Sequence, residues 1–364
     1  MKNILYAAGS IGHIKSFHIP YIEALRKEGN RVTVMARGAG ADIDMPFVKR
    51  LFSPKNLLCA IRASRIIKRE KFDTVILNTT LAAFCIRLFL PRRHRPLVIN
   101  IVHGYMFSPR PRGLRERLFL LSEILLRGRC DHVMLMNAED LESAEKYKLY
   151  GSTLTLIRGF GASVTPEHMS RTEMRQKYHG DSKKFIITFV GELCALKDQR
   201  LLIRALAIVK RDIPEAALWL VGDGAAGGEL ILCAAEAGVS DSVLFMGRRE
   251  GACDFIRAAD LYVSASRKEG LPFNIIEALG CSRTVIASDI KGHRDIIEDG
   301  VSGFLFKVGD AEALASLILS VYRGALAPSP QAIADRYKLF SFDTVFPDTK
   351  AKLISLITKP AATS

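Results

Sequence analysis

The chain of 364 residues exceeds one ordinary hydrophobic core and suits two domains. Apolar residues make up 49% of it and charged residues 25%, a composition that excludes a disordered or fibrous protein. The formal net charge is +14, and residues 1–150 hold 26 Lys and Arg against 13 Asp and Glu. That half is therefore expected to face an anionic partner, whether a membrane surface, a phosphorylated substrate or a nucleic acid.

The cysteines and the apolar segments indicate the cellular compartment of the protein and its type of membrane contact. Seven cysteines form no C-x-x-C pair and have no histidine at metal-ligand spacing, so buried, reduced thiols in a cytosolic protein are expected. The N-terminus has an apolar run too short for a signal peptide. No stretch approaches the ~20 apolar residues of a spanning helix, so any membrane contact is expected to be peripheral.

Short runs rich in β-branched residues alternate with longer amphipathic runs in the first half. This alternation indicates βαβ units around a parallel sheet. The expected strands span residues 3–8, 31–36, 74–78, 97–103, 132–137 and 153–158. The expected helices span residues 17–28, 56–70, 80–90, 114–127 and 138–148.

The loop after the first expected strand reads AAGSIGHIKSFH and opens a helix. Its glycines, Gly9 and Gly12, do not form the G-x-G-x-x-G pattern, so a dinucleotide fingerprint is not present there. Gly12 at the helix start would still let the backbone approach a phosphate or a sugar closely.

Residues 109–129, PRPRGLRERLFLLSEILLRGR, combine an apolar helix with six arginines at 110, 112, 115, 117, 127 and 129. One apolar stripe is expected to pack on the core, formed by Leu114, Leu118, Leu121 and Leu125. Further apolar residues exceed what one core face requires: Phe119, Leu120, Ile124 and Leu126. Two interpretations stay open, a helix lying on anionic lipid and a buried helix with a solvated arginine rim.

Residues 158–168 are rich in Gly, Ser, Thr and Pro and are interpreted as a link between domains. The alternation then restarts, with strands expected at 184–191, 217–222, 243–247, 261–266, 284–288 and 303–306. Two successive α/β halves imply a cleft, which the carboxyl ends of the strands would face. After residue 325 two helical stretches are expected, and residues 360–364 resemble a frayed tail.

The stretch SRKEGLPFNIIEALGCS, residues 266–282, places two glutamates eight positions apart around a helix. Pro272 suits the first turn, and Gly280 can end the apolar run that follows it. Glu269 then falls just before the helix, and Glu277 lies about one and a half turns inside it.

The start of this helix has the properties of a phosphate site. Its first N–H groups form a positive pole, and they belong to Gly270, Leu271, Phe273 and Asn274. The two carboxylates would repel a phosphate and instead accept hydrogen bonds from ribose or sugar hydroxyls. The plain alternative is a strand and a Pro-started helix with two solvent-facing glutamates.

The stretch EGLPFNIIE, residues 269–277, resembles the motif of the family-4 retaining glycosyltransferases, in which seven residues separate two glutamates. FVGELCALKDQRLLIRAL, LWLVGDG, VLFMGRRE and ASDIKGHRDIIEDGVSGFLF resemble successive segments of that family's C-terminal domain. In the first half, GHIKSFHIPYIEALRKEGNRVTVMA, HGYMF and HVMLMNAEDLESAEKY look like the subgroup that builds capsular or exopolysaccharide repeat units. The likeness covers almost the whole chain.

The resemblance implies an α/β fold of the GT-B type, with two Rossmann-like domains whose parallel sheets face an interdomain cleft. Residues 1–160 would form the N-terminal, acceptor-binding domain. Residues 161–340 would form the C-terminal domain that binds the nucleotide sugar. Residues 341–364 would supply a helix that returns to the N-terminal domain, and the tail.

The resemblance also implies a donor site. Glu277 matches the glutamate that holds the ribose, Glu269 matches the one that contacts hydroxyls of the transferred sugar, and Lys197 matches a lysine that neutralises the diphosphate. Where the family has an arginine after the glycine matching Gly191, this chain has Glu192, so Arg248 or Arg267 would have to supply the charge. The complete expected donor set is Gly12, Gly191, Glu192, Lys197, Phe245, Gly247, Arg248, Glu269, Gly270, Leu271, Phe273, Asn274 and Glu277.

Histidines would serve the acceptor side. His103 ends its strand and matches a family histidine near the donor sugar or the acceptor, and Gly104, which follows it, is expected to bind the acceptor with it. His13 and His18 are candidates for acceptor contact, with capping or packing as the alternative for each. The expected catalytic residues are Glu269, Lys197 and His103.

The implied activity is the transfer, with retention, of a sugar from a nucleotide sugar, taken to be a UDP-sugar, to a lipid-linked diphosphate or glycan acceptor. The leaving phosphate would help to deprotonate the acceptor, while the protein positions the substrates and stabilises charge. No DxD-like motif lies near the site, so no metal or other cofactor is expected to be essential. The enzyme would be cytoplasmic and peripheral on the inner membrane through its basic N-terminal half.

Three alternatives stay open. An NADP-dependent oxidoreductase would use VGDGAAGGE, with Arg248 and Arg249 about 20 residues later, although that fingerprint belongs in the first βα unit of a domain. A sugar-nucleotide epimerase of the same fold would need no acceptor, and Glu192 leaves a binding module without catalysis conceivable. A nucleic-acid partner is not expected, because no aromatic-interleaved basic patch or known motif supports it.

Overall fold

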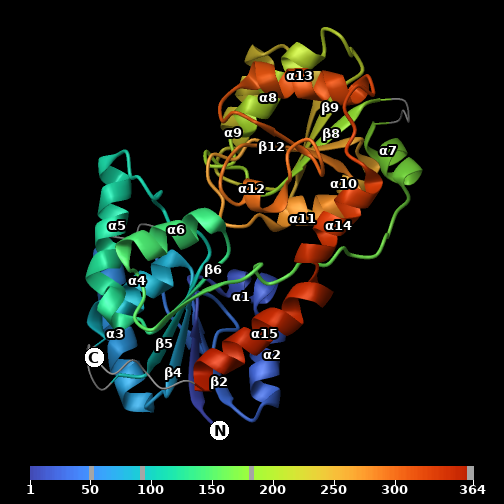
Figure 1. Ribbon diagram of the computed structural model, residues 1–364. Coiled ribbons are helices and arrows are strands. Elements are labelled where there is room, and N and C mark those ends of the chain that lie inside the picture. The colour runs from blue at the N-terminus through green and yellow to red at the C-terminus, as the bar shows by residue number, and fades with distance from the viewer. Residues whose placement is uncertain (49–52, 91–94, 180–183, 359–364) are drawn as a thin grey trace. The chain divides into compact units, whose positions relative to one another are not determined.

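The computed structural model describes residues 1–48, 53–90, 95–179 and 184–358, and the chain divides into two compact units (Figure 1). Unit 1 comprises Met1–Phe160 and Val345–Ser364, and unit 2 comprises Gly161–Thr344. The tail expected at residues 360–364 lies outside the described residues.

Unit 1 contains a seven-stranded sheet in the order β3-β2-β1-β4-β5-β6-β7, and each of its pairings is parallel. Its strands are β1 (Asn3–Ala7), β2 (Arg31–Ala36), β3 (Ile43–Asp44), β4 (Thr74–Asn78), β5 (Leu97–Val102), β6 (His132–Leu135) and β7 (Thr153–Leu156). The prediction missed only β3, because two residues carry no periodicity. The strand order reverses between β1 and β4, so the loops after these strands diverge there.

Most helices of unit 1 connect consecutive strands along the chain (Figure 1). They are α1 (Ile11–Phe17), α2 (Ile19–Lys27), α3 (Pro54–Glu70), α4 (Thr80–Phe89), α5 (Leu114–Leu126), α6 (Ala138–Tyr147) and most of α15 (Phe342–Thr358), with a 3-10 turn at Arg127–Arg129. The single helix expected over residues 17–28 is instead two helices that meet at His18. Pro20 explains the break, because it lacks an N–H and tolerates only the first turn of α2.

The C-terminal residues of α15 belong to unit 1. Thr349 Oγ1 donates to the carbonyl of Gly159 at 3.2 Å, and Lys2 Nζ donates to the carbonyl of Ile357 at 2.5 Å. The chain therefore returns to its first unit after it has completed the second.

The orientation of α5 contradicts the expectation that its leucine stripe packs on the core. Four leucines are exposed along it: Leu114, Leu118, Leu121 and Leu125. Its buried residues are Leu120, Glu123 and Leu126. Glu123 forms two 2.8 Å contacts with Nη2 of the fully buried Arg87 of α4, and this pair fixes which face turns inward. Periodicity could not choose the face, because α5 is apolar on several sides.

Unit 2 contains a six-stranded sheet in the order β10-β9-β8-β11-β12-β13, again with parallel pairings. All six strands were predicted: β8 (Ile186–Val190), β9 (Ala217–Val221), β10 (Val243–Gly247), β11 (Leu261–Ser264), β12 (Thr284–Ser288) and β13 (Phe304–Phe306). The order reverses between β8 and β11. The loops that follow these two strands therefore diverge at the edge where ligands bind in open α/β sheets.

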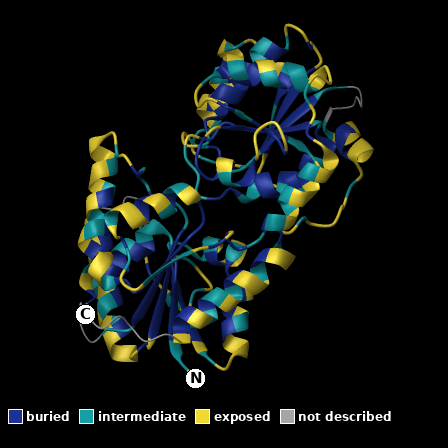
Figure 2. Cartoon of the chain, viewed as in Figure 1, coloured by how far each residue is buried: buried dark blue, intermediate teal, exposed yellow. Residues whose placement is uncertain are grey.

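The helices of unit 2 are α7 (Arg171–His179), α8 (Gln199–Val209), α9 (Gly227–Glu236), α10 (Ala252–Ala258), α11 (Phe273–Gly280), α12 (His293–Ile296), α13 (Ala311–Tyr322) and α14 (Pro330–Phe340), with a 3-10 turn at Ser240–Ser242. Figure 2 shows the buried residues gathered in the sheet of each unit. Two parallel sheets with alternating helices confirm the predicted fold class.

The cysteines and helix lengths bear on two further expectations. All seven cysteines are free thiols, five of them buried, with Cys194 and Cys233 half-buried. Among the described residues, no helix combines the length and the apolar character needed to cross a membrane.

Candidate functional site

The loop after β8 packs so closely on the loop after β9 that glycine is required at their contact. A Cβ on Gly222 would lie 1.9 Å from the carbonyl oxygen of Gly191, and one on Gly224 would lie 2.2 Å from that of Leu193. These are glycines of the VGDGAAGGE stretch. Their presence is thus explained by packing within unit 2 and does not require a dinucleotide.

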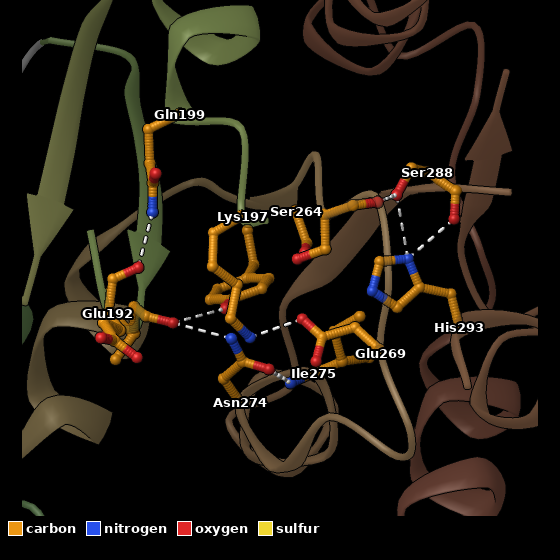
Figure 3. Close-up of polar contacts among 12 residues, drawn as sticks. Glu192, Lys197, Gln199, Ser264, Glu269, Asn274, Ile275, Ser288 and His293 are labelled. Atoms are coloured by element: carbon orange, nitrogen blue, oxygen red, sulfur yellow. Dashed lines mark hydrogen bonds and ion pairs between the residues drawn. The ribbon is translucent and has the colours of Figure 1, made fainter. Parts of the chain in front are cut away.

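Lys197 and Glu269 come together at the point where β8 and β11 diverge. Lys197 lies in the loop after β8, Glu269 lies in the loop after β11, and Lys197 Nζ is 2.5 Å from Glu269 Oε1 (Figure 3). Their side chains are 21% and 13% exposed, respectively. A cation and a carboxylate are therefore held side by side in a partly buried position that a ligand can still reach.

Two contacts hold these loops together. The guanidinium of Arg267 donates to Asp198 at 2.8 Å, and the backbone N–H of Arg267 donates to the carbonyl of Leu196 at 2.8 Å. Arg267 was a candidate for the missing phosphate charge. In this structure it instead bridges the segments that carry Lys197 and Glu269.

The start of α11 is tied to the end of β8. The carbonyl of Val190 accepts hydrogen bonds from Asn274 Nδ2 at 2.7 Å and from the hydroxyl of Tyr262 at 3.3 Å. Burial raises the pKa of Tyr262 well above its usual value, so this phenol stays protonated and donating. The helix start is thereby fixed beside the loop that carries Lys197.

Glu277 lies inside α11 and is half-buried. Burial, with a smaller contribution from the charge of Cys253, raises the pKa of Glu277 to about 8. Within the described residues its carboxyl group has no hydrogen-bond or ion-pair partner. A partly desolvated carboxyl group without a partner gains hydrogen bonds when a ligand brings donors to it.

His293, at the start of α12, is a site residue that the sequence interpretation missed. Its Nδ1 lies 2.7 Å from the carbonyl oxygen of Ser288, which can only accept, so Nδ1 carries the proton. Burial lowers the pKa of His293 to about 4, so the ring is neutral and Nε2 keeps a lone pair. Figure 3 shows the ring beside Glu269. Nε2 is buried and has no partner in the part of the chain that the structure describes.

A signal for His293 existed in the sequence. It stands five residues after the end of β12, which neighbours β11, so it belongs to the same carboxyl edge of the sheet as Glu269. The segment before His293 packs closely on the loop that carries Glu269, because a Cβ on Gly292 (φ +80°) would lie 2.6 Å from the carbonyl oxygen of Gly270. Histidines at strand edges are too common for the residue type alone to have marked it.

A pocket of about 490 Å³ adjoins these loops within unit 2. It is lined by residues 190–192, 221–224, 248, 249 and 252. Gly191, Glu192 and Arg248 of the expected donor set therefore share one pocket. Phe245 packs its ring partly against the core of the unit, and Gly247 accepts a backbone hydrogen bond from Gly222 at 2.9 Å.

Three histidines gather at the carboxyl edge of the unit 1 sheet. His13 Nε2 lies 3.4 Å from His103 Nε2. His18 is fully buried, and its Nδ1 forms a 2.9 Å hydrogen bond with the hydroxyl of Tyr6. Ser10 caps α1 by accepting from the N–H of His13, and a Cβ on Gly12 would meet open space. The burial of His18 weighs against direct contact with an acceptor. His13 and His103 are only half-buried.

The histidine cluster is uncharged at neutral pH. Burial lowers the pKa of His13 to about 4 and those of His18 and His103 well below their usual value. The ligand atoms of the three lie within 4.8 Å of one another, and within the described residues they are the group whose geometry could hold a metal ion. Neutral imidazoles suit either a metal or hydroxyl groups.

The structure thus brings Lys197 beside Glu269 at the start of α11 and places Glu277 within that helix. Gly270, Leu271, Phe273 and Asn274 form the same helix start. In unit 1 it brings His13, His18 and His103 together, with Gly104 following His103. These are placements only, and the roles assigned to the residues stay predictions.

Comparison with known proteins agrees with this architecture. The family described as "Glycosyltransferase Family 4" matches residues 21–158, and the family described as "Glycosyl transferases group 1" matches residues 170–337. EpsD of Bacillus subtilis (strain 168), named as a candidate glycosyltransferase, is 31% identical over 335 residues, which are 88% of this chain and 87% of EpsD. The Escherichia coli UDP-Gal:alpha-D-GlcNAc-diphosphoundecaprenol alpha-1,3-galactosyltransferase is 23% identical over 274 residues, 73% of this chain and 70% of that protein.

Solved structures share the fold. HepE of Anabaena, in complex with UDP and glucose, has a TM-score of 0.76 at 22% identity and covers 98% of this chain and 100% of its own. Sucrose-phosphate synthase from Thermosynechococcus elongatus has a TM-score of 0.78 at 18% identity, over 98% and 99% of the two chains. The chain belongs to the family-4 glycosyltransferases and is a glycosyltransferase of the GT-B fold.

Proposed function

We propose that the protein transfers a sugar from a UDP-sugar, with retention of anomeric configuration, to a lipid-linked or glycan acceptor in surface polysaccharide synthesis. The observation that carries this proposal is the contact of Lys197 with Glu269 beside the start of α11. A cation and a helix N-terminus suit a diphosphate, and a neighbouring carboxylate suits sugar hydroxyls. The NADP alternative loses its support, because the chain belongs to a glycosyltransferase family and packing alone accounts for Gly222 and Gly224 of its fingerprint.

Unit 2 would bind the donor. Glu277 would accept hydrogen bonds from the ribose hydroxyls, and the backbone from Phe245 to Arg248 would line the base. Uracil as the base is supported by the solved complex of HepE with UDP and by the printed name of the Escherichia coli relative. Glu192 replaces the arginine of the family, so Lys197 and the start of α11 would carry the neutralisation of the diphosphate.

The residues around Glu269 would recognise the transferred sugar. Glu269 and His293 Nε2 both offer acceptors, and sugar hydroxyls are donors. A neutral imidazole with a buried lone pair gains a hydrogen bond only when such a hydroxyl arrives. His293 would therefore act with Glu269 in choosing which sugar is held.

The transfer step needs no redox chemistry. The bond between the anomeric carbon and the diphosphate oxygen breaks, and its electron pair stays on that oxygen. The acceptor oxygen bonds to the anomeric carbon on the same face, and its proton passes to the departing phosphate. Lys197 would stabilise the charge that develops on the diphosphate.

Unit 1 would bind the acceptor through His13 and His103, whose neutral rings can orient a hydroxyl, with His18 holding them in place. The name of the Escherichia coli relative includes a diphosphoundecaprenol acceptor, which supports a lipid-linked diphosphate here. The basic residues 1–150 suit such an acceptor, and the enzyme would work on the cytoplasmic face of the membrane. An epimerase of the same fold would form product without any acceptor.

At a pH above about 8, where the Glu277 carboxylate is ionised, Glu277→Gln is expected to weaken UDP-sugar binding by about 1.5–3 kcal/mol, because a charge-assisted hydrogen bond is lost. A thermal-shift panel of UDP-, GDP- and ADP-sugars measures this and identifies the base.

The raised pKa of Glu277 also makes the stability of the protein depend on pH. Between about pH 4.5 and 8 the folded protein holds a proton that the unfolded chain releases, so stability falls as pH rises. The variant should lack that fall, and equal ligand shifts in both proteins would contradict the assignment.

Lys197→Ala is expected to lower kcat by about 10²–10³-fold while weakening UDP-sugar binding much less, because its charge acts mainly on the departing diphosphate. Arg200→Ala is the matched control, since Arg200 is an exposed cation at the start of α8 paired with Glu229. Steady-state kinetics of both variants decide the matter. A proportional rise of KM at unchanged kcat would show that Lys197 serves only binding.

His293→Asn is expected to leave the affinity for UDP unchanged and to reduce the preference for the UDP-sugar over UDP. Asparagine can still donate toward Ser288 but cannot reach the position of Nε2. Isothermal titration of both ligands gives the ratio of affinities. Equal losses for UDP and for the UDP-sugar would point to a structural role for the ring.

No metal is proposed to be essential, because Lys197 and the start of α11 would neutralise the diphosphate. Dialysis against EDTA should leave at least about half of the transferase activity, since the proposed charge stabilisation comes from the protein alone. Activity that is lost on chelation, restored by Zn²⁺ and abolished by His103→Ala would instead assign a metal to the histidine cluster.

A further inference from the structure

The surface of α5 carries leucines where a globular protein usually carries polar residues. Leu114 is 76% exposed, and the other three are 46%, 49% and 61% exposed at Leu118, Leu121 and Leu125. Figure 2 shows exposed residues recurring along this helix. Scattered single exposed leucines are common, but four on one helix form a continuous patch.

The spacing of these leucines places them on one strip. At about 100° per residue, positions 114, 118, 121 and 125 fall within about 60° of the helix circumference. Leu120, Glu123 and Leu126 lie on the opposite side and are buried. We refer to Leu114, Leu118, Leu121 and Leu125 as the leucine strip.

The core cannot take up the leucine strip. Glu123 and Arg87 form a buried ion pair, with side chains 7% and 0% exposed. Rotating α5 to bury the strip would leave both charges without a partner, which is strongly unfavourable for buried ions. A contiguous exposed apolar patch on a protein surface marks a contact with another apolar surface, so the leucine strip is suited to such a contact.

Arginines border the leucine strip. Arg115 and Arg117 are exposed and lie on its two sides, at about 100° and about −60° from Leu114. Arg110 and Arg112 precede the helix and Arg127 follows it, all three exposed. Glu116, in contrast, turns toward Ser108 and the backbone of Arg112. No carboxylate of the described residues forms an ion pair with Arg115 or Arg117.

We propose that α5 lies flat in the surface of an anionic lipid bilayer, with the leucine strip among the acyl chains and the arginines at the lipid phosphates. An apolar centre with a cationic border is complementary to such an interface. A second copy of the chain fits less well, because a two-fold pairing of this face would set arginines against arginines. The surface explains how an enzyme for a lipid-linked acceptor would reach it.

This inference rests on the proposed function only for the reason why the enzyme would bind a membrane. Vesicle binding itself needs neither donor nor acceptor. Flotation of the 364-residue protein with phosphatidylcholine vesicles, with and without about 30% phosphatidylglycerol, measures binding. We expect binding to the anionic vesicles alone, weakened by salt. Leu118→Ser/Leu121→Ser/Leu125→Ser should reduce binding at least about tenfold, because three inserted side chains are lost.

The controls use other exposed residues. Ile231→Ser/Leu232→Ser on α9 removes two side chains that are 55% and 65% exposed, with glutamates rather than arginines on that helix, and should change binding less than twofold. Arg115→Gln and Arg117→Gln should each reduce binding about fivefold. Transferase activity on a water-soluble acceptor should persist in all these variants, which separates this proposal from the donor site.

Insertion itself is measurable by fluorescence. Trp219 is the chain's only tryptophan and is fully buried. Leu118→Trp therefore adds the one exposed indole, whose emission should shift to the blue and be quenched by brominated lipid. Unchanged emission, equal binding to neutral vesicles, or a dimer by light scattering that the triple serine variant dissociates would overturn the proposal.

Discussion

The ion pair between Lys197 and Glu269 links two loops that belong to different strands of one sheet, and the arrangement of the proposed donor site depends on it. Each side chain alone would be a partly buried charge, and together they compensate one another. Arg267 and Asp198 brace the same loops at 2.8 Å, and the carbonyl of Val190 ties them to the start of α11. The charges are therefore positioned before any ligand arrives, which is the condition for stabilising a diphosphate without reorganisation.

Chain topology explains why these residues meet. Lys197 and Glu269 are 72 positions apart, but β8 and β11 are neighbours at which the strand order reverses, so their loops diverge around a common space. The third neighbour, β12, adds His293 to the same edge through its contact with Ser288. In unit 1, His13 in the helix after β1 and His103 directly after β5 meet with their Nε2 atoms 3.4 Å apart, although β4 lies between these two strands. Each unit thus collects its polar groups where its strands end.

The sequence predicted those parts of the protein that depend on local pattern. Buried parallel strands are short, β-branched runs bounded by glycine, so six strands in each half were found, and the glutamates at 269 and 277 could be placed around α11. Three features depend on tertiary contacts instead. The pairing of Glu123 with Arg87 decides which face of α5 is buried. The pairing of β12 with β11 brings His293 to the edge of the sheet that holds Glu269. The ion pair with Asp198 holds the side chain of Arg267 between the two loops. Spacing placed His293 shortly after an expected strand, but it could not reveal which partners these residues meet.

A crystal structure of the protein with UDP tests the central claim most directly. The account predicts that the diphosphate lies against the backbone N–H groups at the start of α11 within hydrogen-bond distance of Lys197 Nζ, with the ribose hydroxyls at Glu277. A diphosphate bound elsewhere, with the pair of Lys197 and Glu269 undisturbed and out of its reach, would contradict the account.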